Sequence, residues 1–420
     1  MNRRLRLAGM TSHALFVLLF FLCSAQATQP STVNVSGTLG EIEGIRVLRV
    51  WGEPRERGFA HGYLLADTIV ELADGLLANS PLGITLERYT KQMLPKLERM
   101  KIDPRHEVEM QGILAGMEAK LGGPAKIDFL KRPLTYEDIV AINCTSDFIR
   151  SGCSSFAAWG EMTENGHTIA GRNMDWHELA SMVKTPIVCV NTSSPRVGAK
   201  GWVGITWPAF VGCLTGMNSE GVTVATHDAD GRPPSVTTGF TPYCWTFRRV
   251  VELASADTAF EDAARVVRGE ISIVGNNMMV TRPFASGHAA AAVLEFDADL
   301  TNGDGLTVRT AVEGGLFLIC TNHLLERRGP INCWRYGQLG RVLERIAESN
   351  RTRHVTSDRV RKMLRGVSPK DTFTYHSVVF EPDKRLMHVA FANSVQDAPE
   401  CKHVTLDVTK LLAGDYPGGR

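Results

Sequence analysis

The sequence predicts an α+β fold in which antiparallel sheets are covered by helices. After Cys153, short apolar runs alternate with turn signals such as Asn165-Gly166, which is the pattern of β-hairpins. Segments with helical periodicity lie between these hairpins, and such an order is typical of layered α+β domains. The 420 residues are 44% hydrophobic and 22% charged, so the composition is that of a globular protein rather than a disordered one.

The first residues predict export. Arg3, Arg4 and Arg6 precede the apolar run 14–22, and Ala25-Gln26-Ala27 is a small-residue cleavage site. The apolar run is too short to span a bilayer as a typical helix, so we interpret residues 1–27 as a secretory signal peptide. The mature protein is expected to begin near Thr28, to be periplasmic or secreted, and to keep no stable membrane span.

The segment 28–152 is predicted to be mainly helical after one strand at 45–51. Apolar side chains recur at helical spacing over 65–76, and charged and apolar residues alternate similarly over 86–100 and 105–120. Pro95 is expected to kink or split the helix at 86–100. A further helix is predicted at 134–148, where Thr135 and Asp138 resemble an N-terminal cap.

Four hairpins are predicted in the remainder of the chain. The first joins 154–162 to 168–173 through a two-residue turn at Asn165-Gly166. The others pair 214–217 with 222–226, 293–296 with 306–312, and 376–380 with 386–391. The apolar run 316–321 is predicted to be a buried strand. Helices are expected at 246–253, 260–267, 336–347 and 357–364.

Composition and missing motifs exclude several classes of function. Lys and Arg number 46 against 45 Asp and Glu, and a net charge of +1 argues against binding to nucleic acid. The chain has no CxxC pair and no HExxH, GxSxG, P-loop or GxGxxG motif. We therefore predict neither a metal nor a cofactor.

The candidate for chemistry is Cys153, at the boundary between the helical and the strand-rich segments. Gly152 before it permits an unusual backbone geometry, although a single cysteine at a strand start is more often a packing residue. The predicted turn places Trp159 opposite Arg172 and Phe156 opposite Asp175. Arg172 then shares the face of Cys153, whereas Asp175 shares it only if the strand bulges or ends near Asn173.

Four blocks of sequence carry a specific resemblance. The block "GCSSFAAWGEMTENGHTIAGRNMDW" at 152–176 resembles the N-terminal-nucleophile (Ntn) cysteine hydrolases. It is most similar to the acyl-CoA:6-aminopenicillanate (isopenicillin N) acyltransferase family, and more distantly to penicillin V acylase, bile salt hydrolase and acid ceramidase. The blocks "GEPRERGFAHGYLL" at 52–65, "LTGMNSEGVTVA" at 214–225 and "TNH" at 321–323 follow in the order that the family has.

The resemblance implies a four-layer αββα sandwich of the Ntn-hydrolase type with a helical N-terminal pro-segment, 28–152, and a catalytic chain, 153–420. It also implies self-cleavage between Gly152 and Cys153, after which the two chains stay associated. The freed α-amine of Cys153, with a reference pKa of about 7.7–8.0, would serve as the general base for the thiol. The thiol would then attack a linear amide in a small N-acyl or peptide-like substrate and form a thioester.

The resemblance also assigns roles to other residues. Arg172 and Asp175 match the arginine and aspartate that follow the nucleophile, where they favour the thiolate and orient the α-ammonium. Asn322 matches an asparagine of the oxyanion hole.

Four further residues are candidate substrate contacts. They are Trp176, the pair His227-Asp228 where some relatives have asparagine, and Arg335, which aligns loosely with a site arginine. His227 is also compatible with an ordinary buried histidine, and Arg335 with a surface residue.

The sequence thus favours an exported, self-processing cysteine amidohydrolase, with acyl transfer through the same thioester as a second outcome. Two alternatives stay open: a cysteine–histidine hydrolase that is not processed, and a catalytically inactive binding protein on the same scaffold.

Overall fold

The computed structural model describes residues 33–80, 83–148, 152–193, 198–232, 234–285, 288–301, 303–329, 332–349 and 353–416. Residues from Val35 onward form one compact unit. The predicted signal peptide, 1–27, lies outside the described residues, and so do the three positions just before Gly152. Within the described ranges, no helix combines the length and the apolar character needed to cross a membrane.

Within the described residues, fifteen strands form two sheets. The strands are β1 (Gly37–Ile42), β2 (Ile45–Gly52), β3 (Gly152–Gly160), β4 (Gly166–Trp176), β5 (Ile187–Ser193), β6 (Trp202–Thr206), β7 (Thr215–Asn218), β8 (Thr223–Ala229), β9 (Gly275–Thr281), β10 (Ala291–Phe296), β11 (Leu306–Thr310), β12 (Phe317–Thr321), β13 (Phe373–Glu381), β14 (Leu386–Phe391) and β15 (Val404–Asp407). The nine-stranded sheet has the order β1-β2-β5-β6-β7-β8-β9-β10-β11, and the six-stranded sheet has the order β12-β3-β4-β13-β14-β15.

The helices are α1 (Pro54–Ala78), α2 (Leu86–Arg88), the π-helix η1 (Tyr89–Met93), the 3₁₀-helix η2 (Leu94–Arg99), α3 (Pro104–Leu121), α4 (Tyr136–Asn143), α5 (Thr145–Phe148), α6 (Ala180–Lys184), α7 (Tyr243–Leu253), α8 (Ala259–Arg268), α9 (Leu325–Arg328), α10 (Trp334–Ala347), α11 (Ser357–Gly366) and α12 (Val408–Ala413). Two short 3₁₀-helices, η4 (Pro382–Lys384) and η5 (Ala398–Glu400), flank β14.

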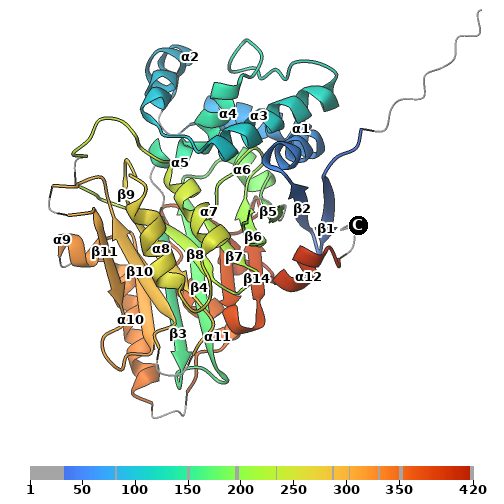
Figure 1. Ribbon diagram of the computed structural model, residues 1–420. Coiled ribbons are helices and arrows are strands. Elements are labelled where there is room, and N and C mark those ends of the chain that lie inside the picture. The colour runs from blue at the N-terminus through green and yellow to red at the C-terminus, as the bar shows by residue number, and fades with distance from the viewer. Residues whose placement is uncertain are drawn as a thin grey trace, which may run out of the picture. The chain divides into compact units, whose positions relative to one another are not determined.

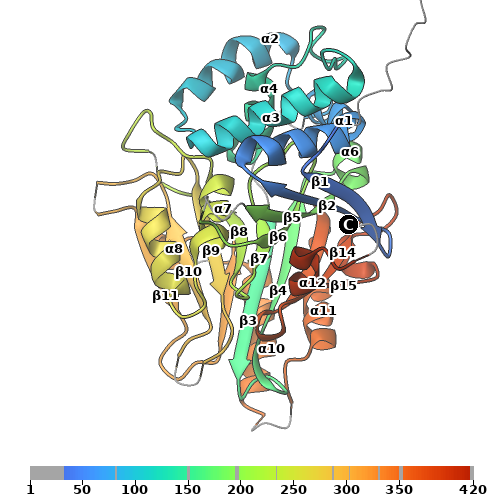
Figure 2. The ribbon, with the colours of Figure 1, turned by 45° about the vertical axis from the view of Figure 1, so that its right-hand side comes forward.

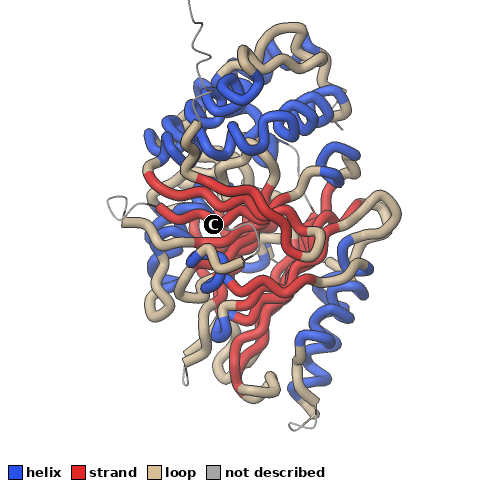
Figure 3. The backbone as a smooth tube through the Cα atoms, turned by 90° about the vertical axis from the view of Figure 1, so that its right-hand side faces the viewer, coloured by secondary structure: helices blue, strands red, loops and turns tan. Residues whose placement is uncertain are grey.

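The two sheets pack face to face, with helices on both outer sides (Figures 1, 2 and 3). Alternating side chains divide the core. Val293 of β10 packs between the sheets, whereas its neighbour Leu294 belongs to the core cluster that includes side chains of α1, α3, α7 and α8. On the six-stranded sheet, Phe156 faces α10 and α11 while Ala157 faces the other sheet. This period of two is the pattern of strands buried on both faces. The predicted four-layer α+β arrangement is therefore confirmed.

Most predicted elements are confirmed. The helical segment after β2 forms α1, α3 and α4, and Thr135 begins α4 with the reciprocal cap that its spacing to Asp138 predicts. The helix predicted at 86–100 is divided into α2, η1 and η2, with Pro95 in the first turn of η2. The strand at 316–321 is β12, and the last three hairpins pair as expected.

The two-residue turn predicted for the first hairpin is wrong. Gly160 pairs with Gly166, so five residues connect the strands instead of two. A two-residue turn of the Asn-Gly type needs a positive φ at both residues. Gly166 has a φ of 73°, whereas Asn165 has no positive φ, and Gly160 supplies the second left-handed residue with a φ of 57°. The pairing therefore moves, and Arg172 faces Ser155 while Asp175 faces Gly152.

Helices α1 and α3 lie in backbone contact because of small residues. A Cβ atom on Gly58 would lie 1.9 Å from the carbonyl oxygen of Glu109, and one on Gly62 would lie 1.9 Å from that of Ile113. The close approach brings Arg57 of α1 to Glu109 of α3, where the two side chains form a buried ion pair of 3.0 Å. Helices α1 and α3 are thus tied to each other by close packing and a buried ion pair.

Candidate active site

Cys153 is the second residue of β3 and is fully buried. It faces Met174 of β4, and directly opposed residues of antiparallel strands project on the same side of the sheet. Its backbone N–H donates a 2.7 Å hydrogen bond to Oδ1 of Asn322. This N–H is on the nitrogen atom of the peptide bond between Gly152 and Cys153, which is the predicted cleavage bond.

Arg172 is a buried cation on the face of Cys153, as the sequence predicts. It lies diagonally across from Cys153 on β4, within the reach of a long side chain. Its Nε donates to Oγ1 of Thr215 at 2.5 Å and one terminal nitrogen donates to the carbonyl of Thr226 at 2.6 Å. The other terminal nitrogen has no hydrogen-bond partner, and no carboxylate of the described residues pairs with the guanidinium. A buried cation of this kind favours an anion beside it, such as the Cys153 thiolate.

Asp175 lies on the opposite face of β4, because the strand continues through Trp176 without the bulge that a shared face would need. Its side chain still reaches the start of β3, since its Cβ would lie 3.4 Å from a Cβ placed on Gly152. Thr374 donates to its Oδ1 at 2.6 Å and Arg335 donates to its Oδ2 at 2.9 Å. Burial raises the pKa of Asp175 to about 6, although Thr374, Arg335 and Arg172 oppose the rise.

Asn322 follows the end of β12 and connects these groups. Its Oδ1 accepts from Cys153 and, at 2.8 Å, from a terminal nitrogen of Arg335, while its Nδ2 donates to the carbonyl of Asp228. With the Gly152–Cys153 bond intact, the amide oxygen rather than the NH₂ group faces Cys153. These contacts support a role for Asn322 at the cleavage bond. Because the NH₂ group does not face Cys153, they do not show the oxyanion-hole donor that the resemblance implies.

Arg335, at the beginning of α10, bridges Asp175 and Asn322. Its side chain is 13% exposed and lies between two residues that the sequence analysis also assigns to the site. One planar guanidinium reaches both acceptors, which an arginine fork does better than a lysine.

His227 is fully buried between the sheets. One ring nitrogen lies 2.7 Å from Oγ of Ser155, and the other lies 3.4 Å from the carbonyl of Asn277. Burial, with a smaller contribution from Arg172, lowers the pKa of His227 well below its ordinary value, so the ring is neutral. Among the described residues it does not line the pocket next to the site, and its contacts are those of a hydrogen-bonded buried histidine.

Asp228 follows His227 on β8. Its carbonyl accepts from Asn322, and its carboxylate accepts from Nδ2 of Asn276 at 3.0 Å. A hydrogen bond and charge repulsion from this carboxylate, after burial itself, raise the pKa of the neighbouring Tyr243. Asp228 therefore positions Asn322 through its backbone and faces a pocket residue through its side chain.

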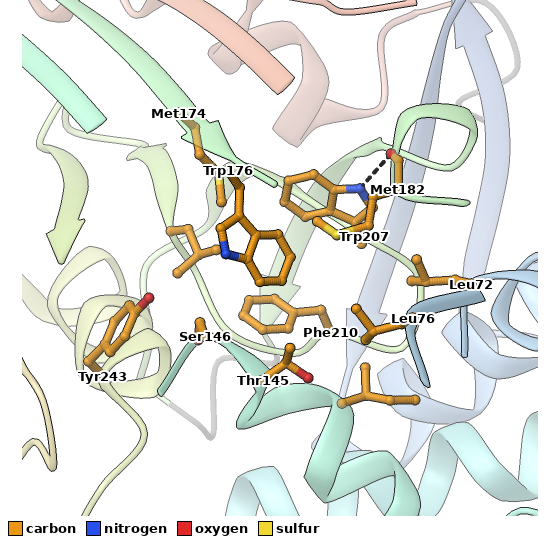
Figure 4. Close-up of a pocket in the computed structure, with 12 residues that line it drawn as sticks. Leu72, Leu76, Thr145, Ser146, Met174, Trp176, Met182, Trp207, Phe210 and Tyr243 are labelled. Carbon is orange, nitrogen blue, oxygen red and sulfur yellow. Dashed lines mark hydrogen bonds between the residues drawn. The ribbon is translucent and has the colours of Figure 1, made fainter. Parts of the chain in front are cut away.

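An apolar pocket of about 50 Å³ adjoins the site on the Met174 side (Figure 4). The rings of Trp176, Trp207 and Phe210 lie together in it, and Trp207 is fixed by a 2.9 Å hydrogen bond to the carbonyl of Met182. The indole N–H of Trp176 is buried without a partner. Thr145 and Ser146 of α5 also line the pocket, together with Leu72 and Leu76 of α1, Ile142, Leu214 and Tyr243.

Three contacts of the site were not foreseen. Thr215 and Thr374 hold Arg172 and Asp175, and Ser155 binds His227. A threonine in a strand carries no sign of its partner, because cross-sheet neighbours depend on how the two sheets are stacked. Ser155 was within reach of prediction, since it is two residues from Cys153 and so shares its face. Within the described ranges, no three His, Cys, Asp or Glu side chains are arranged to hold a metal ion.

Comparison with known proteins gives limited similarity in sequence. No family model matches the chain. The protein dcd1B of Dictyostelium discoideum is 24% identical over 184 residues, which are 42% of this chain and 36% of that protein. The match thus spans about a third of the length of this curated relative.

Three solved structures are similar. The Caenorhabditis elegans N-acylethanolamine-hydrolyzing acid amidase ortholog is 17% identical, with 61% of this chain and 99% of that chain covered and a TM-score of 0.40. A variant of the conjugated bile acid hydrolase of Clostridium perfringens is 11% identical, with 61% and 93% covered and a TM-score of 0.43. The penicillin V acylase of Agrobacterium tumefaciens is 14% identical, with 62% and 87% covered and a TM-score of 0.40. A bile acid hydrolase and a penicillin V acylase are also among the proteins that the sequence blocks resemble.

Proposed function

We propose that the protein is an exported cysteine amidohydrolase that cleaves itself before Cys153 and then hydrolyses linear N-acyl amides. The observation that carries the proposal is the setting of Cys153. Its nitrogen is held by Asn322, which Arg335 ties to Asp175. The buried guanidinium of Arg172, which pairs with no carboxylate of the described residues, lies on its thiol face.

In the processing step, Sγ of Cys153 loses its proton and attacks the carbonyl carbon of Gly152. The C–N bond breaks, the nitrogen of Cys153 takes up a proton and leaves as an amine, and a thioester remains on the same residue. Water then hydrolyses this thioester to the carboxylate of Gly152 and the free thiol. Asn322 supports the step because its Oδ1 already accepts from the leaving nitrogen at 2.7 Å.

In the mature cycle, the new α-amine of Cys153 is the general base for the thiol on the same residue. Arg172 favours the thiolate, which attacks the substrate carbonyl and expels the amine. Water resolves the thioester, and an amine in its place would give acyl transfer. Hydrolysis is favoured because export separates the enzyme from cytoplasmic acyl-CoA.

The pocket beside Met174 supports an apolar group in the substrate. Its lining is aliphatic and aromatic apart from a few hydroxyl groups and the indole N–H of Trp176. A cavity of about 50 Å³ is far below the range of about 300–1,000 Å³ for small-molecule sites, so a substrate requires the pocket to widen. Thr145 and Ser146 precede the cleavage bond, and we expect cleavage to release this wall from Cys153.

A buried charge network supports continued association of the two chains after cleavage. Glu109 of the pro-segment accepts from Arg57 of the same segment and, at 2.8 Å, from Arg248 of α7 in the catalytic chain. Arg248 also pairs with Glu252 at 2.8 Å, and all four side chains are buried. Separation would leave these charges unpaired, which is strongly unfavourable.

The test combines intact mass, N-terminal sequencing and a panel of N-acyl amides. The purified protein should contain a chain that begins at Cys153 and a smaller one that ends at Gly152, and fractionation of the source cells should find both outside the cytoplasm. Cys153→Ala should stay a single chain without activity, while the matched control Cys401→Ala, at a half-exposed cysteine, should be processed and active.

Two results would overturn the proposal. Full activity of an uncleaved wild type would favour a cysteine–histidine hydrolase. An uncleaved protein that turns over no amide, and whose Cys153 no electrophile labels, would favour the inactive binding protein.

A further inference from the structure

The segment from α10 to α11 carries a concentrated positive charge. Between 334 and 366 the sequence has nine Lys and Arg against three Asp and Glu, a surplus of six in a chain whose total surplus is one. The remainder of the chain is therefore negative by five. A positive segment of this size, in a protein whose total net charge is close to zero, indicates a surface that attracts anions.

A groove of about 350 Å³ runs between these two helices, on the outer layer of the six-stranded sheet. Its apolar lining consists of Leu339, Val342, Ile346 and Met363, which continue into the core cluster beneath. The volume falls within the range of about 300–1,000 Å³ for small-molecule sites. An apolar floor of this kind suits an alkyl chain better than a fully hydrated anion.

Apart from Gln338, the polar side chains that line the groove are cationic. Arg345, Arg353, Arg359 and Lys362 surround it, and none of the four pairs with a carboxylate of the described residues. Arg345 and Arg359 donate only to backbone carbonyls of their own neighbourhood.

The cations beside the groove behave differently. Arg361 pairs with Asp358 at 3.3 Å, and Arg365 pairs with Glu400 at 3.0 Å. Four cations without a carboxylate partner among the described residues thus line the groove, where a ligand would meet them.

We propose that this groove binds a single-chain amphiphilic anion, with the alkyl chain along the apolar floor and a carboxylate-type head group among the four cations. Both halves of the ligand are needed to use the site. A small inorganic anion would leave the floor unused, and an alkyl chain with a cationic head would be repelled by the rim. The groove shares no lining residue with the pocket beside Cys153, so the inference does not depend on the proposed catalytic activity.

The test uses calorimetric titration of the full chain, both wild type and Cys153→Ala, with three probes below their micelle concentrations. Dodecanoate should bind one molecule per chain outside the catalytic site. Acetate, which lacks the chain, and dodecyltrimethylammonium, which reverses the charge, should each bind at least tenfold more weakly. Hydrogen exchange in the presence of dodecanoate should show added protection in α10 and α11.

Variants then assign the binding to the groove. The double variant Arg353→Gln, Lys362→Gln should weaken dodecanoate binding at least tenfold, because both side chains are on the rim and carry no ion pair. Its matched control is Lys126→Gln, Lys410→Gln, at two exposed lysines away from the groove, which should bind like the wild type. Val342→Thr, which keeps the size of a half-buried floor residue, should weaken binding several-fold.

Three outcomes would overturn the inference: undiminished binding in the rim variant, equal binding of the cationic amphiphile, or protection confined to elements around Cys153. Binding to phosphatidylglycerol vesicles without binding of monomeric dodecanoate would also overturn it, since a membrane surface and not a groove ligand would then be the partner. None of these outcomes bears on self-cleavage, which is measured separately by mass.

Discussion

Glu109 offers the sharpest test of how the pro-segment is held to the catalytic chain. Its carboxylate accepts from Arg57 at 3.0 Å and from Arg248 at 2.8 Å, and at most 4% of any of the three side chains is exposed. Glu109→Gln keeps the shape of the side chain and removes its charge. Two guanidinium groups then lose a buried counter-ion, although Arg248 keeps Glu252.

The magnitude follows from the pKa. Burial alone would raise the pKa of Glu109, but the guanidinium groups of Arg248 and Arg57 outweigh it and lower the pKa from 4.5 to about 2. At 1.36 kcal/mol per pKa unit this is about 3 kcal/mol, in line with the loss of about 3–5 kcal/mol on breaking a buried pair. Because the folded pKa is depressed, the contribution is complete above pH 4.5 and is lost as the pH falls toward 2.

The assay is urea unfolding of Cys153→Ala proteins, which keep one chain and so allow a single transition to be analysed. Glu109→Gln should lose about 3 kcal/mol of unfolding free energy at pH 7, and the difference from the parent should shrink steadily below pH 4.5. The matched control is Glu87→Gln, which breaks an exposed pair with Lys91 and should cost at most about 0.5 kcal/mol. A loss below about 1 kcal/mol for Glu109→Gln, or one independent of pH, would refute the reasoning.

Three further predictions concern the site. Asn322→Ala in fully processed protein should lower kcat about a hundredfold with little change in KM and a normal melting temperature, whereas a near-normal kcat would remove Asn322 from catalysis. Asp175→Asn should be inactive, yet more stable than its parent by up to about 3 kcal/mol at pH 7. The reason is that burial raises the pKa of Asp175 from 3.8 to about 6 and so disfavours its charged form. In urea titrations this gain in stability should vanish as the pH falls below 4. His323→Ala should retain at least a tenth of kcat/KM, since the proposed base is the α-amine of Cys153, and a thousandfold loss would favour a cysteine–histidine mechanism instead.

The layered fold could be predicted because local signals and global packing agree in most elements. The spacing of Thr135 and Asp138 does produce the cap of α4, and the run before Asn322 does form a buried strand. The prediction for the first hairpin is wrong because an Asn-Gly dipeptide occurs in turns of several lengths. Which length forms depends on whether Asn165 adopts a positive φ. Arg172 still lies on the face of the sheet that was predicted, because the observed register of β3 against β4 differs from the predicted one by an even number of residues.

The contacts of the site could be predicted only where one hairpin carries both partners, as β3 and β4 do. Arg172 was assigned to the face of Cys153 from alternation alone. Arg335 belongs to α10, which packs on the far side of the six-stranded sheet, so no spacing in the sequence relates it to Asp175. Asn322 was found by resemblance, and its link to Arg335 arises from the stacking of α10 on β12.

The charges around Cys153 suggest why one residue can serve as both nucleophile and base. On one face of β4, Arg172 is a buried cation without a carboxylate partner among the described residues; on the other face, Asp175 is a buried carboxylate whose pKa burial raises to about 6. Each is unfavourable in the uncleaved chain. We infer that a free N-terminal cysteine adds a counter-charge to each, its thiolate toward Arg172 and its α-ammonium toward Asp175, which in the uncleaved chain pairs with Arg335. Processing would then relieve the electrostatic cost of the site at the moment it creates the catalytic residue, which explains why the two charges lie on opposite faces of the strand beside Cys153.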